Sequence, residues 1–221
     1  CDMIALVERR EASYNNDAAI ASSNWLSAAK LAYYRAFAAA YGAMGRAAEV
    51  VMVNGSWTQS HVSQLWKQPA EIVFPPCDIE GLLALPERSE EILSREKRFT
   101  ILSIGQIRPE KNHGLQLEIL RSVLDQIEAR KLDVQVSLTI AGGCRNAEDE
   151  ERVQKLKEQA DSLGVSEHVQ WALNVPYDTL LEQLSDALIS LHTMANEHFG
   201  ISVVEALAAG TVMIAHDSAG P

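Results

Sequence analysis

Cysteine is scarce in this sequence. The three cysteines, Cys1, Cys77 and Cys144, are odd in number, lie far apart and include no CxxC pair. This arrangement indicates neither a disulfide framework nor a zinc site, and it favours a reducing compartment.

Basic residues are also few compared with acidic ones. The chain has 19 Lys and Arg residues against 30 Asp and Glu residues, which gives a formal net charge of -11, and no stretch is rich in Lys or Arg. A surface of this sign repels the phosphate backbone of a nucleic acid. We therefore expect no nucleic-acid partner.

Long apolar runs are missing as well. No segment approaches the roughly 20 apolar residues that cross a bilayer, and the N-terminus lacks the basic and apolar regions of a signal peptide. The chain by itself is therefore expected to be soluble. The nearest candidate, Leu31 to Gly45, contains Arg35, and we interpret it as a buried helix rich in Ala and Tyr. A helix lying on a lipid surface is the alternative, but a strongly cationic polar face is missing.

The chain does hold enough apolar sequence for a sizeable core, with 47% hydrophobic residues in 221. From Phe99 onward, strand patterns alternate with helical ones, which predicts a parallel sheet with crossover helices. The predicted strands run from Phe99 to Gly105, Val134 to Gly143, His168 to Leu173, Ala187 to Thr193 and Thr211 to His216. Helices are predicted between them at about Leu115 to Lys131, Ala147 to Leu163, Tyr177 to Ser185 and Gly200 to Ala209.

The first part of the chain has a different pattern. After the Ala/Tyr-rich helix, it predicts a strand from Glu49 to Val53, a helix from near Trp57, and a short strand from Ile72 to Phe74. Pro75 and Pro76 restrict the backbone to extended geometry and favour a stiff connector. Because two strands cannot complete a domain, residues 1–76 are expected to be the remnant of an N-terminal lobe with its linker, unless they pack entirely against the rest. Residues 77–221 are expected to form a second lobe, truncated before its last helices.

Polar and glycine-containing loops follow four of the five predicted strands. They begin at Gly105, Gly142, His192 and His216. Because the carboxyl ends of parallel strands share one edge of a sheet, where ligands bind, these loops predict a single binding cleft.

Two basic residues in the first of these loops suit an anion. Arg108 and Lys111 are three positions apart with Pro109 between them, so a planar guanidinium and a point charge can reach the same diphosphate. A salt bridge to Glu110 or to a neighbouring helix explains the pair equally well.

The segment Phe199-Gly200-Ile201 opens a predicted helix. Its free backbone N–H groups can bind a phosphate or sugar oxygen, and Gly200 allows a close approach. A glycine before a helix is also often a packing device.

Glu197 and Glu205 lie eight positions apart near the start of the same helix. Two carboxylates there can accept hydrogen bonds from several sugar or ribose hydroxyls. A capping or salt-bridged pair is the alternative.

The spacing of His192, Glu197 and His198 is not that of a zinc motif, and no Asp-x-Asp occurs, so we expect no metal. The glycine motifs of dehydrogenases and P-loop enzymes are absent too.

A resemblance to a known family rests on four segments: GQIRPEKNH, AGGCRN, LHTMANEHFGISVVEALAAGT and AHDSAGP. Together they resemble glycosyltransferase family four, whose E-x7-E hallmark is here formed by Glu197 and Glu205. The resemblance implies the α/β GT-B architecture, with a Rossmann-like parallel sheet covered by helices on both faces in the C-terminal lobe, plus an incomplete N-terminal lobe.

The segments VVMVNGSWT, VFPPCD and HTMANEHFGI are similar to a narrower eukaryotic group of the family. Its members transfer mannose in α-1,2 linkage from GDP-mannose to a dolichol-diphosphate-linked oligosaccharide on the cytosolic face of the endoplasmic reticulum. The resemblance thus implies these two substrates, retention at the anomeric carbon, and a membrane reached through segments outside this chain. Another donor or acceptor, or a catalytically inert nucleotide-binding fragment, are the alternatives.

The resemblance also assigns roles to residues. Arg108 and Lys111 would hold the GDP diphosphate and stabilise its leaving charge without a metal, Glu197 would bind the donor sugar, and Glu205 the ribose. The remaining donor-binding residues implied are Gly105, Gly142, His192, Phe199, Gly200 and Ile201.

Overall fold

The structure is a computed structural model that describes residues 4, 7–10, 16–86 and 97–221. The chain divides into two compact units, Cys1–Pro75 and Pro76–Ala219, with the last two residues outside this simple division. The division falls one residue before the boundary that the proline pair predicts.

Besides helical residues at positions 4, 7 and 8, the first unit contains three further helices and two short strands among its described residues. They are α2 (Ala18–Ser22), α3 (Asn24–Gly45), β1 (Met52–Val53), α4 (Ser56–Trp66) and β2 (Glu71–Ile72). The two strands pair in parallel, with α4 as the crossover between them. A small core of Val51, Val53 and Ala70 packs against Val62 and Trp66 of α4.

The long helix α3 corrects one prediction. The segment from Leu31 to Gly45 is helical as expected, but it is not buried, since Tyr33 is 64% exposed and Phe37 is 58% exposed. The side of α3 that does approach α4 carries glycines, and a Cβ added to Gly45 would lie only 2.1 Å from the Trp66 ring. Close contact between α3 and α4 thus involves a narrow strip at the end of α3. In the part of the chain that the structure describes, no helix has both the length and the apolar character to cross a bilayer.

The second unit is built on a five-stranded sheet in which all pairings are parallel. The strands are β3 (Arg98–Ile104), β4 (Gln135–Gly142), β5 (Val169–Leu173), β6 (Ala187–His192) and β7 (Val212–Ala215). The helices that connect them are α7 (His113–Ala129), α8 (Ala147–Ser162), α9 (Tyr177–Asp186) and α10 (Ile201–Ala208), preceded by α5 (Glu80–Leu83). Short 3-10 turns, η1 (Pro109–Lys111) and η2 (Ser166–His168), precede α7 and β5. The predicted strands and crossover helices are therefore confirmed.

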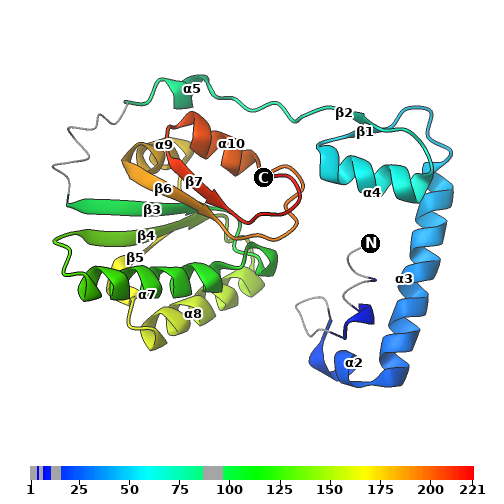
Figure 1. The fold of residues 1–221 in the computed structure, drawn as a ribbon, viewed down its shortest axis with the longest axis horizontal. Coiled ribbons are helices and arrows are strands. Elements are labelled where there is room, and N and C mark those ends of the chain that lie inside the picture. Colours follow the sequence, from blue (N-terminus) through cyan, green and yellow to red (C-terminus); the bar gives the residue numbers. More distant parts are fainter. Residues whose placement is uncertain (1–3, 5–6, 11–15, 87–96) are drawn as a thin grey trace. The chain divides into compact units, whose positions relative to one another are not determined.

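Helices cover both faces of this sheet (Figure 1). On one face, α7 and α8 bury Leu117, Leu120 and Leu156 against Leu138 and Ile140 of β4. On the other face, α5, α9 and α10 form a second cluster, whose buried members are Leu82, Leu102, Ala141, Ala172, Leu184, Ala187 and Ala206. Successive residues of a strand point to opposite faces, so Ile140 and Ala141 belong to different clusters.

The strand order is β5-β4-β3-β6-β7. From β3 at the centre, β4 and β5 are added on one side of the sheet. The chain then crosses to the other side of β3, where β6 and β7 are added. This reversal opens a crevice at the carboxyl ends of β3 and β6, where ligands of open parallel sheets bind. The loops that meet there are those beginning at Gly105 and Thr193.

Candidate functional site

A cavity of about 600 Å³ opens at this crevice. It is lined by the loops that follow β3, β4, β5 and β6 and by the first turns of α10. Seven of the ten residues proposed from the sequence line it: Gly105, Arg108, Lys111, Gly142, Glu197, Ile201 and Glu205. The topology thus brings the two cations and the two carboxylates to one concave site.

The other three predicted residues lie outside the lining. His192 is buried at the end of β6, next to Glu197. Gly200 is the N-cap of α10 and has φ of 79°, so this position needs a residue that tolerates the left-handed region. Phe199, which precedes it, does not line the cavity either. The predicted loop beginning at His216 is likewise absent from the lining.

Several lining residues were not predicted from the sequence. They are Ile104, Gln106, Glu110, Ala141, Gly143, Asn174, Val175, Leu180, Met194 and Ser202. Asn174 and Val175 directly follow β5, so the rule that pointed to the other four strand ends also applied here. The Asn174 side chain accepts from the Cys144 N–H at 2.9 Å and donates to the Cys144 carbonyl at 2.7 Å, which ties the loops after β4 and β5 together.

Glycine is required at one strand end of the cavity but not at another. A Cβ on Gly142 would lie 1.8 Å from the carbonyl oxygen of Gly105, where backbone cannot give way. A Cβ on Gly105 would meet only the side chain of Lys111, at 3.4 Å.

We therefore expect Gly142→Ala and Gly105→Ala to differ. Gly142→Ala should cost about 3 kcal/mol of unfolding free energy, because β3 and β4 must move apart at this edge. Gly105→Ala should cost under about 1 kcal/mol and should instead crowd Lys111. Urea unfolding of the two variants tests this contrast, and equal destabilisation would contradict it.

The two cations have different partners. Lys111 Nζ lies 2.6 Å from Glu197 Oε2, and the two side chains are only 21% and 16% exposed. The Arg108 guanidinium is 42% exposed, and its nearest carboxylate is Glu110 at 3.8 Å. Lys111 is thus held by a short, partly buried ion pair, whereas Arg108 is only loosely paired and open to a ligand.

Glu197 is held by three groups. Besides Lys111, the Nε2 atom of His192 lies 3.3 Å from Oε2, and the backbone N–H of His198 donates to Oε1 at 3.0 Å. Contact with His192, followed by Lys111 and the His198 amide, lowers the pKa of Glu197 to about 2, although burial opposes this. The carboxylate is therefore ionised at neutral pH, where it can accept hydrogen bonds but cannot serve as an acid.

Glu205 stands apart from this ion pair. Burial raises the pKa of its carboxyl group above the usual value. Among the described residues, no side chain forms a salt bridge with it, so its oxygens are available to hydroxyl donors in the cavity.

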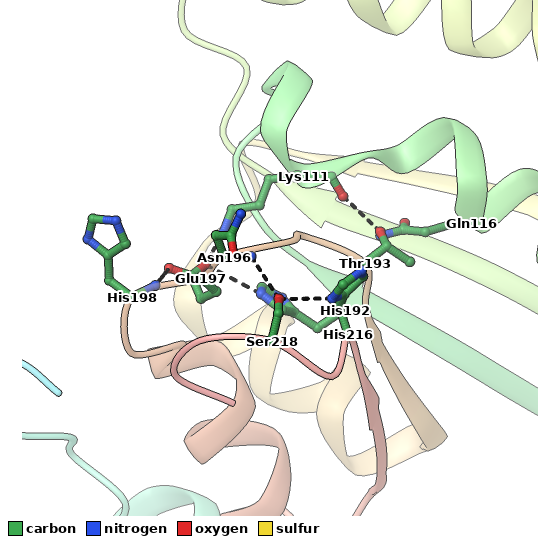
Figure 2. Close-up of polar contacts among 9 residues, drawn as sticks. All are labelled: Lys111, Gln116, His192, Thr193, Asn196, Glu197, His198, His216 and Ser218. Carbon is green, nitrogen blue, oxygen red and sulfur yellow. Dashed lines mark hydrogen bonds and ion pairs between the residues drawn. The ribbon is translucent and has the colours of Figure 1, made fainter. Parts of the chain in front are cut away.

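The loop from Thr193 to Gly200 is fixed from two sides (Figure 2). The Thr193 hydroxyl donates to the Lys111 carbonyl at 2.8 Å and accepts from Gln116 Nε2 at 2.9 Å. Further along, the Asn196 N–H donates at 2.9 Å to Ser218 Oγ, which also contacts His216 Nδ1. The loop after β7 thus holds the backbone of Asn196, next to Glu197, but does not line the cavity.

Two protein-family models match separate parts of the chain. A family model described as "Glycosyl transferases group 1" matches residues 86–221. The chain belongs to this glycosyltransferase family. A second model, described as "ALG11 mannosyltransferase N-terminus", matches residues 1–66.

Several relatives of this glycosyltransferase share the name "GDP-Man:Man(3)GlcNAc(2)-PP-Dol alpha-1,2-mannosyltransferase". The Caenorhabditis elegans protein of that name is 54% identical over 222 residues, which cover 100% of this chain and 47% of the relative. The human protein is 44% identical over 226 residues, which cover 100% of this chain and 44% of the relative. The chain thus spans about half the length of the curated relatives it matches.

Solved structures share the fold of this glycosyltransferase. Sucrose-phosphate synthase from Thermosynechococcus elongatus matches with a TM-score of 0.63 at 19% identity, over 98% of this chain and 49% of that protein. HepE from Anabaena, solved with UDP and glucose, also gives 0.63 at 19% identity, over 80% of this chain and 46% of that one. The predicted α/β GT-B assignment is confirmed, and so is the resemblance to the α-1,2-mannosyltransferase group.

One buried histidine, His113, begins α7 two residues after the cavity-lining Lys111. His113 is 3% exposed, and neither ring nitrogen has a hydrogen-bond partner among the described residues. Burial, followed by the charges of Lys111 and Arg152, lowers its pKa to about 4. The imidazole is therefore neutral in the folded protein at neutral pH.

This histidine should make the fold sensitive to mild acid. In the unfolded chain His113 takes up a proton near its ordinary pKa of about 6.5, so unfolding is favoured as the pH falls from about 6.5 toward 4. At pH 5 the free energy of unfolding should be about 2 kcal/mol lower than at pH 7. The contribution of Glu197 is lost only between about pH 4.5 and 2 and does not interfere.

Urea unfolding at pH 7 and pH 5 measures the effect. His113→Leu should remove most of the 2 kcal/mol difference, whereas His168→Leu, at a half-buried site outside the cavity lining, should keep it. An unchanged pH dependence in His113→Leu would mean that other groups cause it.

Proposed function

We propose that the full-length protein is a retaining glycosyltransferase that uses GDP-mannose. In this proposal it adds mannose in α-1,2 linkage to a dolichol-diphosphate-linked oligosaccharide during assembly of the N-glycan precursor. The single observation that supports it most is the cavity in which Arg108, Lys111, Glu197 and Glu205 converge.

The cavity offers complementary groups for each part of such a donor. A diphosphate fits Arg108 and Lys111, because a guanidinium and an ammonium from one turn can contact the same anion. Their positive charge stabilises the departing GDP in the transition state. Ribose hydroxyls can donate to Glu205, and hydroxyls of the sugar can donate to the ionised Glu197.

The choice of mannose and of the lipid-linked acceptor rests on the relatives. Their name specifies GDP-mannose, the dolichol-diphosphate oligosaccharide and the α-1,2 linkage, and two of them are 54% and 44% identical to the whole chain. With this acceptor, we place the protein at the cytosolic face of the endoplasmic reticulum membrane, reached through segments outside this chain.

The chemistry fits attack from the face that GDP leaves, with retention at the anomeric carbon. A carboxylate with a pKa of about 2 is no proton donor, so Glu197 cannot be the acid of a two-carboxylate glycosidase scheme. The proton of the acceptor hydroxyl is then taken by the departing diphosphate, which Arg108 and Lys111 keep in place.

We also propose that the reaction needs no metal. In the described part of the chain, no three His, Cys, Asp or Glu side chains are grouped so that they could hold an ion. Transfer by the full-length protein should stay within about twofold after treatment with EDTA, since two cations already neutralise the diphosphate. Loss of transfer with EDTA and recovery with Mg²⁺ or Mn²⁺ would contradict this.

The test of the function is transfer of radiolabelled mannose by the full-length protein to a dolichol-diphosphate oligosaccharide. Incorporation from GDP-mannose, and release of the new residue by an α-1,2-specific mannosidase, is expected. Activity with another nucleotide sugar in place of GDP-mannose would overturn the donor assignment. Absence of both transfer and GDP binding would favour an inert protein.

A further inference from the structure

Under the proposed function, Lys111 binds two different anions, the Glu197 carboxylate and the donor diphosphate. In the structure its ammonium is bound to Glu197 at 2.6 Å, yet a donor diphosphate entering the cavity requires the same charge. If Lys111 turns toward the diphosphate, the Glu197 carboxylate, only 16% exposed, loses its cation. A partly buried carboxylate without a countercharge is costly.

His192 is the residue best placed to take over. Its ring is 4% exposed, and its Nε2 atom lies 3.3 Å from the same Oε2 atom that Lys111 contacts. Although this is close enough for an ion pair, Nε2 has no well-formed hydrogen bond in the structure. The buried ring nitrogen is therefore near enough to lower the pKa of the carboxylate, but it does not yet form a hydrogen bond of good geometry.

The neighbouring groups do not offer this alternative. The His198 backbone contacts the other oxygen, Oε1, and the His198 ring points away from the carboxylate (Figure 2). The ring of His216 contacts Ser218 instead. Besides Lys111, the one side chain within ion-pair distance of Oε2 in the described part of the chain is His192, whose position at the end of β6 is set by the sheet.

We propose that His192 is a positioning residue for Glu197. When the diphosphate draws Lys111 away, His192 Nε2–H donates to Glu197 Oε2 and keeps the carboxylate directed at the donor sugar. His192 itself touches neither donor nor acceptor, since it does not line the cavity. This inference rests on the proposed function and adds to it a residue whose hydrogen bond to Glu197 matters most once the donor is bound.

Three substitutions in the full-length protein test the idea. His192→Phe keeps a ring of similar size and removes the donor, His192→Gln keeps a side-chain N–H, and His168→Phe controls for the loss of a half-buried histidine elsewhere. We expect His192→Phe to lower kcat for mannose transfer ten- to a hundredfold, with the Kd for GDP changed less than threefold. His192→Gln should recover most of kcat, and His168→Phe should resemble the wild type.

A double-substitution cycle separates positioning from a structural role. In a Glu197→Gln background, His192→Phe should reduce single-turnover transfer by less than a further twofold, because the group that it positions is already lost. An undiminished loss in that background, or equal losses of kcat and GDP affinity without rescue by glutamine, would overturn the inference.

The outcomes also separate this inference from the proposed function. GDP binding by His192→Phe at wild-type affinity shows that the variant is folded, so an unchanged kcat there would refute the positioning role alone. A wild-type protein that binds no GDP would refute the proposed function itself. If His192→Phe fails to fold, His192→Gln and His192→Ala are compared instead. The inference predicts a higher kcat for His192→Gln than for His192→Ala, and equal values would refute it.

Discussion

Glu197→Gln is expected to remove most of the turnover while GDP binds as well as before or more tightly. In the structure, Glu197 holds Lys111 through a 2.6 Å ion pair. The neutral amide releases this ammonium to the diphosphate, so the Kd for GDP should stay equal or fall by up to about tenfold. Turnover should fall by about 10² to 10³, because a charged group that faces the sugar in the transition state is lost.

Calorimetry with GDP and a transfer assay on the full-length protein measure the two effects. Glu118→Gln, on an exposed position of α7, is the matched control and should change neither. If Glu197→Gln instead weakens GDP binding by as much as it lowers kcat, the carboxylate contributes to nucleotide binding rather than to the chemical step.

Arg108→Ala should weaken GDP binding more than Lys111→Met does. The Arg108 guanidinium is 42% exposed, with its nearest carboxylate 3.8 Å away, so little must be broken when a diphosphate arrives. Lys111 must give up its ion pair with Glu197 before it can bind the phosphate, so it contributes less to the free energy of GDP binding than Arg108 does. We expect about a hundredfold higher Kd for Arg108→Ala and about tenfold for Lys111→Met.

Titrations at several salt concentrations add a second readout, because loss of a cation that contacts phosphate reduces the salt dependence of binding. Arg121→Ala is the control, since Arg121 pairs with Asp125 on α7 and does not line the cavity. A larger effect from Lys111→Met than from Arg108→Ala would show that the Lys111–Glu197 pair is already open in solution.

Local sequence patterns predicted the second unit well. The alternation of apolar strands with amphipathic helices predicted the five strands and the four crossover helices to within two residues, because each pattern shows which face is buried. The short elements α5, η1 and η2 were not predicted. The placement of polar loops at the carboxyl edge then follows from parallel pairing alone. Asn174 and Val175 were missed although the same reasoning applied to the end of β5.

Long-range features could not be predicted in the same way. The strand order, with β6 next to β3, depends on tertiary packing, and it is this order that joins Lys111 to Glu197 across 86 positions. The prediction that α3 is buried failed for a related reason. Composition shows that a helix is apolar, but which of its faces is covered depends on contacts made by distant segments.

A crystal structure of the protein soaked with GDP tests the central claim most directly. The account predicts a diphosphate within hydrogen-bond distance of Arg108 and Lys111, the ribose at Glu205, and a Lys111–Glu197 separation longer than 2.6 Å. GDP bound elsewhere, or a Lys111–Glu197 pair still 2.6 Å apart at saturating GDP, would contradict it.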